Sequence, residues 1–149
     1  MQIRQAGPAD AAAVRALTRQ AYGKWVPVIG REPKPMLADF DVAVGEHQVA
    51  LLERSGVLLG LVEVIAEADH LLVENLAIHP EHQRQGLGRR LLAHAEALGL
   101  AQGFSEARLY TNQAFAGNVA LYQSAGWAVE RTEPFMGGTT VFMRKRLGG

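Results

Sequence analysis

The stretch HQRQGLGRRLL, residues 82–92, decides how the middle of the chain folds. It places two glycines among three arginines and two glutamines, just after the proline at position 80. Glycine inside a helix costs about 1 kcal/mol relative to alanine, so Gly86 and Gly88 indicate a turn that needs bare backbone. The leucines that follow recur at helical spacing, which predicts a helix that runs from this turn to about Gln102.

A strand, a glycine turn and a helix N-terminus direct unpaired backbone N–H groups and the positive end of the helix dipole at one small volume. Arg84, Arg89 and Arg90 add positive charge there. The pattern predicts a phosphate site, and from the glycines alone a plain strand-to-helix turn with solvated arginines is an equal alternative. Two other phosphate motifs fail, because Leu91 stands where a dinucleotide fingerprint needs glycine and the Gly-Lys-Ser/Thr of a Walker A loop is missing.

The amino-acid composition limits the classes of function that this protein can have. The chain has 149 residues, 48% of them hydrophobic, which suits one domain over residues 1–149. Fifteen acidic and fifteen basic side chains leave no net charge, so we expect neither nucleic acid nor a membrane as partner. The N-terminus lacks the apolar core of a signal peptide and no apolar run is long enough to span a bilayer, so we expect a cytoplasmic protein.

The chain contains no cysteine, which removes disulfides, thiolate zinc sites and cysteine acyl-enzyme chemistry. His79 and His82 suggest a metal site, but Pro80 separates them and no third ligand is evident nearby. We therefore expect no metal.

Hydrophobic periodicity and turn residues predict the other elements. We expect strands over residues 2–5, 47–53, 57–66, 70–78, 106–111, 127–132 and 139–146. We expect helices that open at Pro8–Asp10 and end at Gly23, and over residues 35–40 and 114–124, while residues 24–34 form a loop because prolines and a glycine break every period. This order predicts a mixed α/β sheet covered on both faces.

Three segments carry a family resemblance. They are LLVENLAIHPEHQRQGLGRRLLAHAEA (71–97), LYTNQAFAGNVALYQSAGW (109–127) and VFMRKRL (141–147). The first contains Gln83-Arg84-Gln85-Gly86-Leu87-Gly88, which fits the signature Gln/Arg-x-x-Gly-x-Gly/Ala. The chain resembles the GNAT superfamily of acetyl-CoA-dependent N-acetyltransferases over roughly residues 47–147. The resemblance implies a largely antiparallel α/β sheet of six to seven strands, splayed between the fourth and fifth strands, with about four helices on both faces.

By this resemblance the coenzyme A pyrophosphate lies on the amides of Gln85 to Arg89. The pantetheine arm lies in the splayed gap and bonds the backbone of Leu76, Ala77 and Ile78, as an added strand would. Many relatives contact pantetheine through an asparagine seven residues before the catalytic tyrosine, a position held here by Phe115. Asn118 or Asn112 is the substitute, although Asn118 could equally cap a helix.

The resemblance also places Tyr122 as the acid that protonates the departing thiolate, four residues before Gly126. The alternative is a tyrosine that packs this helix against the sheet. For the general base the candidates are Glu63 and Glu74. A tight turn at Glu67–Asp69 would pair residues whose numbers sum to 137, which sets these carboxylates directly opposite each other, and a one-residue slip would send one to solvent. Like charges so placed would raise one pKa toward neutrality.

In this superfamily the stretch after the first helix walls the acceptor pocket. Tyr22 and Trp25 could clamp a flat or aliphatic group there, and Arg31 could pair with a carboxylate, unless it forms a local ion pair with Glu32. With no cysteine available, we expect direct attack by a primary amine of a small molecule or peptide on acetyl-CoA in a ternary complex. A non-catalytic acyl-CoA-binding module is the alternative function, other acyl donors remain open, and the resemblance makes a homodimer plausible.

Overall fold

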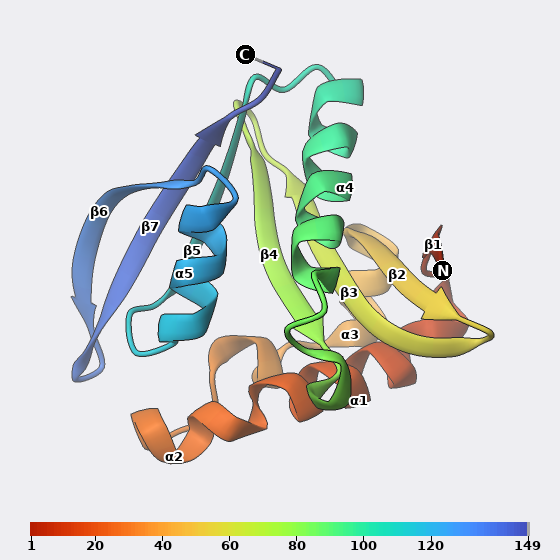
Figure 1. Ribbon diagram of the computed structural model, residues 1–149, viewed down its shortest axis with the longest axis horizontal. Coiled ribbons are helices and arrows are strands. Elements are labelled where there is room, and N and C mark those ends of the chain that lie inside the picture. Colours follow the sequence, from red (N-terminus) through yellow and green to blue (C-terminus); the bar gives the residue numbers. More distant parts are fainter. Residues whose placement is uncertain (149) are drawn as a thin grey trace.

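The computed structural model describes residues 1–148 (Figure 1). Within that range, seven strands form one sheet in the order β1-β2-β3-β4-β5-β7-β6. Their bounds are β1 Gln2–Gln5, β2 Gln48–Arg54, β3 Val57–Ala66, β4 Leu71–Ile78, β5 Glu106–Asn112, β6 Ala128–Phe135 and β7 Gly138–Arg146. Neighbouring strands are antiparallel except β4 and β5, which are parallel. The predicted mixed, largely antiparallel sheet is confirmed.

Helices cover both faces of the sheet, as predicted. Their bounds are α1 Ala11–Tyr22, α2 Val26–Ile29, α3 Phe40–Glu46, α4 Leu87–Ala101 and α5 Ala116–Ser124, with short 3-10 turns at Pro8–Asp10, Gly23–Trp25, Lys34–Leu37 and Pro80–His82. The buried side chains of α1 and α3 belong to one core cluster and those of α4 and α5 to the other. Figure 1 shows α4 and α5 in front of the sheet and α3 behind it. Among residues 1–148, no helix is both long and apolar enough to cross a membrane.

Two expectations between residues 24 and 46 are wrong. The stretch predicted as a loop contains α2, because Pro27 falls in the first helical turn, where its missing N–H costs nothing, and Gly30 ends the helix at φ +75°. The helix predicted over residues 35–40 is a 3-10 turn, and the true helix α3 follows it. Asp39 caps α3 by accepting hydrogen bonds from the N–H groups of Asp41 and Val42, a signal that was present in the sequence.

The sheet parts between β4 and β5. In the described chain these strands pair only at Leu71 with Ala107 and at Leu72 with Arg108, although β4 continues to Ile78 and β5 to Asn112. Figure 1 shows the two strands separating toward the end where α1 lies. The predicted splay is confirmed, and it leaves one backbone edge of β4 without a partner strand.

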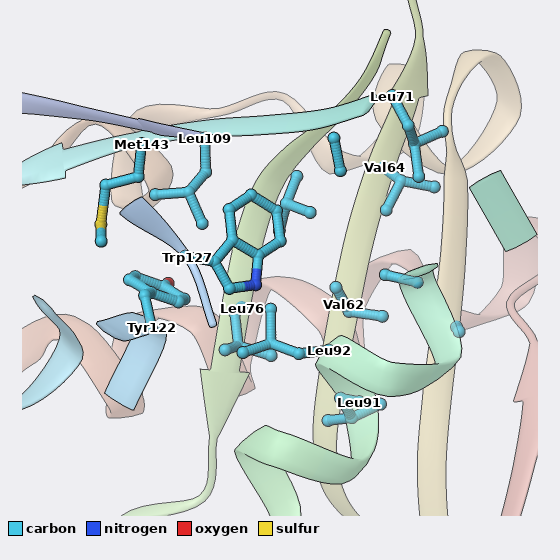
Figure 2. Close-up of a cluster of buried hydrophobic side chains, with 14 of the residues drawn as sticks. Val62, Val64, Leu71, Leu76, Leu91, Leu92, Leu109, Tyr122, Trp127 and Met143 are labelled. Carbon is cyan, nitrogen blue, oxygen red and sulfur yellow. The ribbon is translucent and has the colours of Figure 1, made fainter. Parts of the chain in front are cut away.

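An aromatic side chain fills part of this widening gap. Trp127, which follows α5, is buried in the core that α4 and α5 share with the sheet. Figure 2 shows its indole ring among Leu76, Leu92 and Leu109. Because a dry void between diverging strands would forfeit dispersion contacts, this ring stabilises the separation.

The register between β3 and β4 corrects one prediction. From Ala66 opposite Leu71 to Val64 opposite Val73 the pairing follows the tight turn as expected, but a bulge follows and Glu63 pairs with Asn75. Glu74 is the extra residue of this bulge. The predicted direct pairing of Glu63 with Glu74 is therefore wrong, because one inserted residue shifts the register exactly where the carboxylates would meet.

Candidate active site

Two cavities meet where β4 and β5 part. The first, called here the glycine-turn cavity, has a volume of about 540 Å³ and is lined by the 82–89 turn, the end of α1 and the first turns of α5. The second, the hairpin cavity, has a volume of about 420 Å³ and is lined by the 29–35 segment, the β4 bulge, β5 and the β6–β7 hairpin. Tyr22, Leu76 and Tyr122 line both cavities, so they form the junction.

The first residues of α4, whose N–H groups have no partner within the helix, line the glycine-turn cavity. The first helical hydrogen bond of α4 runs from the N–H of Arg90 to the carbonyl of Gly86, at 3.2 Å. The N–H groups of Leu87, Gly88 and Arg89 precede it, and no described side chain caps this end. All three residues line the cavity. The turn therefore offers a set of clustered donors and the positive end of a helix dipole.

The two glycines of the turn serve different purposes. Gly86 has φ +78°, a left-handed backbone conformation that favours glycine. A Cβ built there would meet no described atom within 4 Å, so the space around Gly86 is open. Gly88 is buried, and a Cβ there would lie 2.9 Å from Cδ2 of Leu121. The expectation that both glycines keep the backbone bare is therefore too simple, because Gly88 also leaves room for the Leu121 side chain of α5.

Four other residues that we predicted to bind the cofactor also lie at this cavity. Ile78, Gln83, Arg84 and Asn118 line the glycine-turn cavity. Gln83 is held there by two contacts, since its Nε2 donates to the carbonyl of Ile78 at 3.3 Å and its Oε1 accepts from Lys24 at 2.9 Å.

Three of the predicted cofactor residues lie elsewhere. Gln85 is exposed, outside the described residues that line this cavity, and Ala77 is buried on the α1 face. Asn112 lines the hairpin cavity, where its Oδ1 accepts the N–H of Ala114 at 2.9 Å.

The junction is buried and aromatic. Tyr22 donates a hydrogen bond from its hydroxyl to the carbonyl of Leu76, at 3.2 Å. Burial raises the pKa of Tyr22, and the nearby Tyr122 raises it further. Burial also raises the pKa of Tyr122, which is 5% exposed. Both phenols therefore stay protonated at neutral pH, and each can act only as a proton donor in that state.

Trp25 lies beside the junction and not in the pocket expected for it. Its ring stacks on Phe115 with centroids 4.8 Å apart, and Tyr22 meets Phe115 edge-on at 6.3 Å. Trp25 lines the glycine-turn cavity. Phe115, where the resemblance led us to expect asparagine, thus builds an aromatic wall with Tyr22 and Trp25.

Two basic side chains and one acidic side chain line the hairpin cavity. Glu74 projects from the β4 bulge, and its Oε1 lies 3.6 Å from Nζ of Lys34. Lys34 also donates to the hydroxyl of Tyr110, a contact that raises the pKa of the lysine. Arg31 lines the same cavity, as expected of an acceptor-pocket residue. Lys34 and Tyr110 were missed in the sequence, because only the fold brings residues 34, 74 and 110 together.

Glu63 is separate from this group. Its buried carboxylate lies 2.6 Å from Nδ1 of His47, and it lines neither cavity described here. Burial raises the pKa of Glu63 even though His47 opposes the shift. Its neighbour across the bulge, Asn75, does line the hairpin cavity; Nδ2 donates to Thr18 at 3.1 Å, and Oδ1 has no partner among residues 1–148. No local pattern marked Asn75.

The histidine pair near the turn has a third neighbour after all. His79, Glu81 and His82 place their ligand atoms within 4.8 Å of one another. The statement that no third ligand lies nearby is therefore wrong. The imidazole Nδ1 of His79 accepts the N–H of Glu81 at 3.1 Å, which gives that ring a structural contact within the 3-10 turn.

Comparison with known proteins places the chain in a family. Residues 12–127 match the model of the Acetyltransferase (GNAT) family, so the chain belongs to that family. Over 81 residues it is 35% identical to N-acetyltransferase family 8 member 3 of Rattus norvegicus, a match that covers 50% of this chain and 36% of that protein. The match thus spans about a third of the length of this curated relative.

Solved structures share the fold. The PaiA N-acetyltransferase from Thermoplasma acidophilum, in complex with coenzyme A, superposes with a TM-score of 0.78 at 20% identity and covers 97% of this chain and 98% of its own. The ribosomal-protein-S18-alanine N-acetyltransferase from Escherichia coli gives 0.76 at 19% identity, with 99% and 94% covered. At these identities the likeness shows a common fold.

Proposed function

We propose that this protein transfers an acetyl group from acetyl-CoA to a primary amine by direct attack of the amine in a ternary complex. The observation that carries the proposal is the meeting of the two cavities at Tyr22, Leu76 and Tyr122. A donor in one cavity and an acceptor in the other would bring thioester and amine together there, which converts a bimolecular step into a positioned one.

The residues of the glycine-turn cavity fit coenzyme A. The N–H groups of Leu87, Gly88 and Arg89 suit a diphosphate, and Arg84 supplies charge beside them. The backbone of residues 76–78 lies on the part of β4 that β5 does not pair, so the amides of pantetheine can bond there as a strand would. When bound, acetyl-CoA supplies the activated acyl group.

We assign the chemical roles by position. Tyr122 donates a proton to the departing thiolate, because it lines both cavities and its phenol is protonated at neutral pH. Backbone N–H groups of β4 near Leu76 stabilise the oxyanion. Glu74 accepts the proton of the amine, because it lines the hairpin cavity, whereas Glu63 is turned to His47.

Release of free thiol from acetyl-CoA against a panel of amines tests this function. We expect turnover by the wild type and a fall in kcat of about 100-fold or more in Tyr122→Phe, the value of a positioned general acid. The phenylalanine keeps the ring, so stabilisation by coenzyme A in a thermal shift experiment should persist in the variant. A wild type that is stabilised by coenzyme A but releases no thiol with any amine would instead be a non-catalytic binding module.

A further inference from the structure

Arg31 is a cation whose partner is missing. The sequence offered Glu32 as a local partner, but Glu32 pairs with Arg19, whose Nη2 lies 3.0 Å from its Oε1. Arg31 forms no ion pair with any residue of 1–148. Its Nε is buried and has no hydrogen-bond partner in that part of the chain. Because a guanidinium does not lose its proton, an anion from outside the chain is the natural way to satisfy it.

The surroundings of Arg31 are apolar. Its guanidinium carbon lies 5.5 Å from the ring centroid of Phe135, and Ile29, Pro33 and Phe142 line the same cavity. The electrostatic attraction between two charges is stronger among such side chains than in open solvent. The same side chains would pack against an aromatic or branched body of the acceptor.

The charges of the hairpin cavity argue against a polycation. Lys34 and Glu74 face each other at 3.6 Å, so the single carboxylate that lines the described cavity already has a cation beside it. The positive charge of Arg31 therefore has no further carboxylate among the described lining residues to neutralise it. A polyamine or an aminoglycoside would bring several further positive charges to this wall, which disfavours it by repulsion.

We propose that the acceptor is a primary amine that also carries a carboxylate and an apolar or aromatic body, such as an amino acid of that type or its derivative. Arg31 holds the carboxylate with its planar fork of donors. One guanidinium matches the single charge of a carboxylate better than the roughly double charge of a phosphate monoester. This substrate class rests on the acetyl transfer proposed above.

Paired acceptors test the class. L-Phenylalanine and 4-(2-aminoethyl)benzoate, which differ in the separation of amine and carboxylate, are each compared with their primary carboxamide, and spermidine serves as the polycation. We expect at least one carboxylate to exceed its carboxamide in kcat/KM by about tenfold or more, the value of one charge-assisted hydrogen bond. Spermidine should be the poorest acceptor.

Variants assign the effect to the side chain. Arg31→Gln should abolish the preference for the carboxylate, so that kcat/KM for the carboxylate falls to that for the carboxamide, and Arg31→Lys should restore part of the preference. Arg54→Gln, which removes an exposed arginine at the end of β2, is the matched control and should behave as wild type. Phenylacetate, which has no amine, should bind wild type and Arg54→Gln in calorimetry and should not bind Arg31→Gln.

The outcomes separate the two proposals. Equal or faster acetylation of the carboxamides or of spermidine overturns the substrate class and leaves acetyl transfer standing. Failure of every amine to be acetylated overturns acetyl transfer and the acceptor assignment with it. Binding of phenylacetate to Arg31→Gln as tightly as to wild type overturns the role of Arg31.

Discussion

The two cavities of this protein are built in different ways. The glycine-turn cavity takes much of its lining from one short run, residues 82–89, and among the described residues it combines the backbone N–H donors of that run with cations alone, namely Lys24, Arg84 and Arg89. The hairpin cavity takes side chains from four distant segments, and its polar groups are Arg31, Lys34, Glu74 and neutral side chains. Backbone N–H donors are present whatever the side chains are, so a site that uses them suits the part of the substrate that all members of a family bind. A site whose polar groups are all side chains can change its chemistry one residue at a time.

The largest effect should come from the hairpin cavity, at Glu74. We expect Glu74→Gln to lower kcat/KM for the amine by about 100-fold, because it removes a carboxylate that can accept a proton at the junction. Glu63→Gln is the matched change on the neighbouring strand and should lower it only a few fold, since that carboxylate faces His47. Thiol release measured over pH 6–9 compares them. Equal losses in the two variants would contradict the assignment by location.

A smaller effect should follow from closing the glycine turn. Gly86→Val places a branched side chain at φ +78°, which costs about 1–2 kcal/mol of stability, and it crowds the approach to the N–H donors. We expect calorimetry to show about a tenfold weaker Kd for coenzyme A, equivalent to roughly 1.4 kcal/mol. Gly86→Asn tolerates the left-handed backbone and so separates strain from obstruction. Unchanged affinity in Gly86→Val would argue that the diphosphate lies elsewhere.

The smallest effect should be one of packing. Gly88→Ala brings a methyl group to 2.9 Å from Cδ2 of Leu121, which is the end of a flexible side chain and can shift. Alanine also gains about 1 kcal/mol over glycine inside a helix, so we expect a net loss of unfolding free energy below about 1 kcal/mol. Denaturation in urea measures the loss. Combining the change with Leu121→Val should recover part of it, because the two residues are in contact and their effects should not add. Strict additivity would show that the contact between Gly88 and Leu121 is not the cause.

Much of the fold could be predicted, because its signals are local. Strand Gln2–Gln5 and the leucine spacing of α4 follow from short-range periodicity, and the αL backbone at Gly86 follows from the residue type. The missed helix α3 had its own local signal in the Asp39 cap. Two site residues were placed wrongly because their location depends on the tertiary structure. Trp25, expected in the acceptor pocket, lines the glycine-turn cavity, and Asn112, expected at the cofactor, lines the hairpin cavity.

The sequence by itself determined the order of the strands, the donor-rich turn and the family, because each depends on residues that are neighbours in the chain. Only the tertiary structure decided which carboxylate reaches the hairpin cavity and which cation stays unpaired there. The physical reason is that strand faces alternate with every residue, so one extra residue at Glu74 changes what faces a cavity. Likewise, Arg31 is left without a carboxylate because Arg19, on another element, takes Glu32.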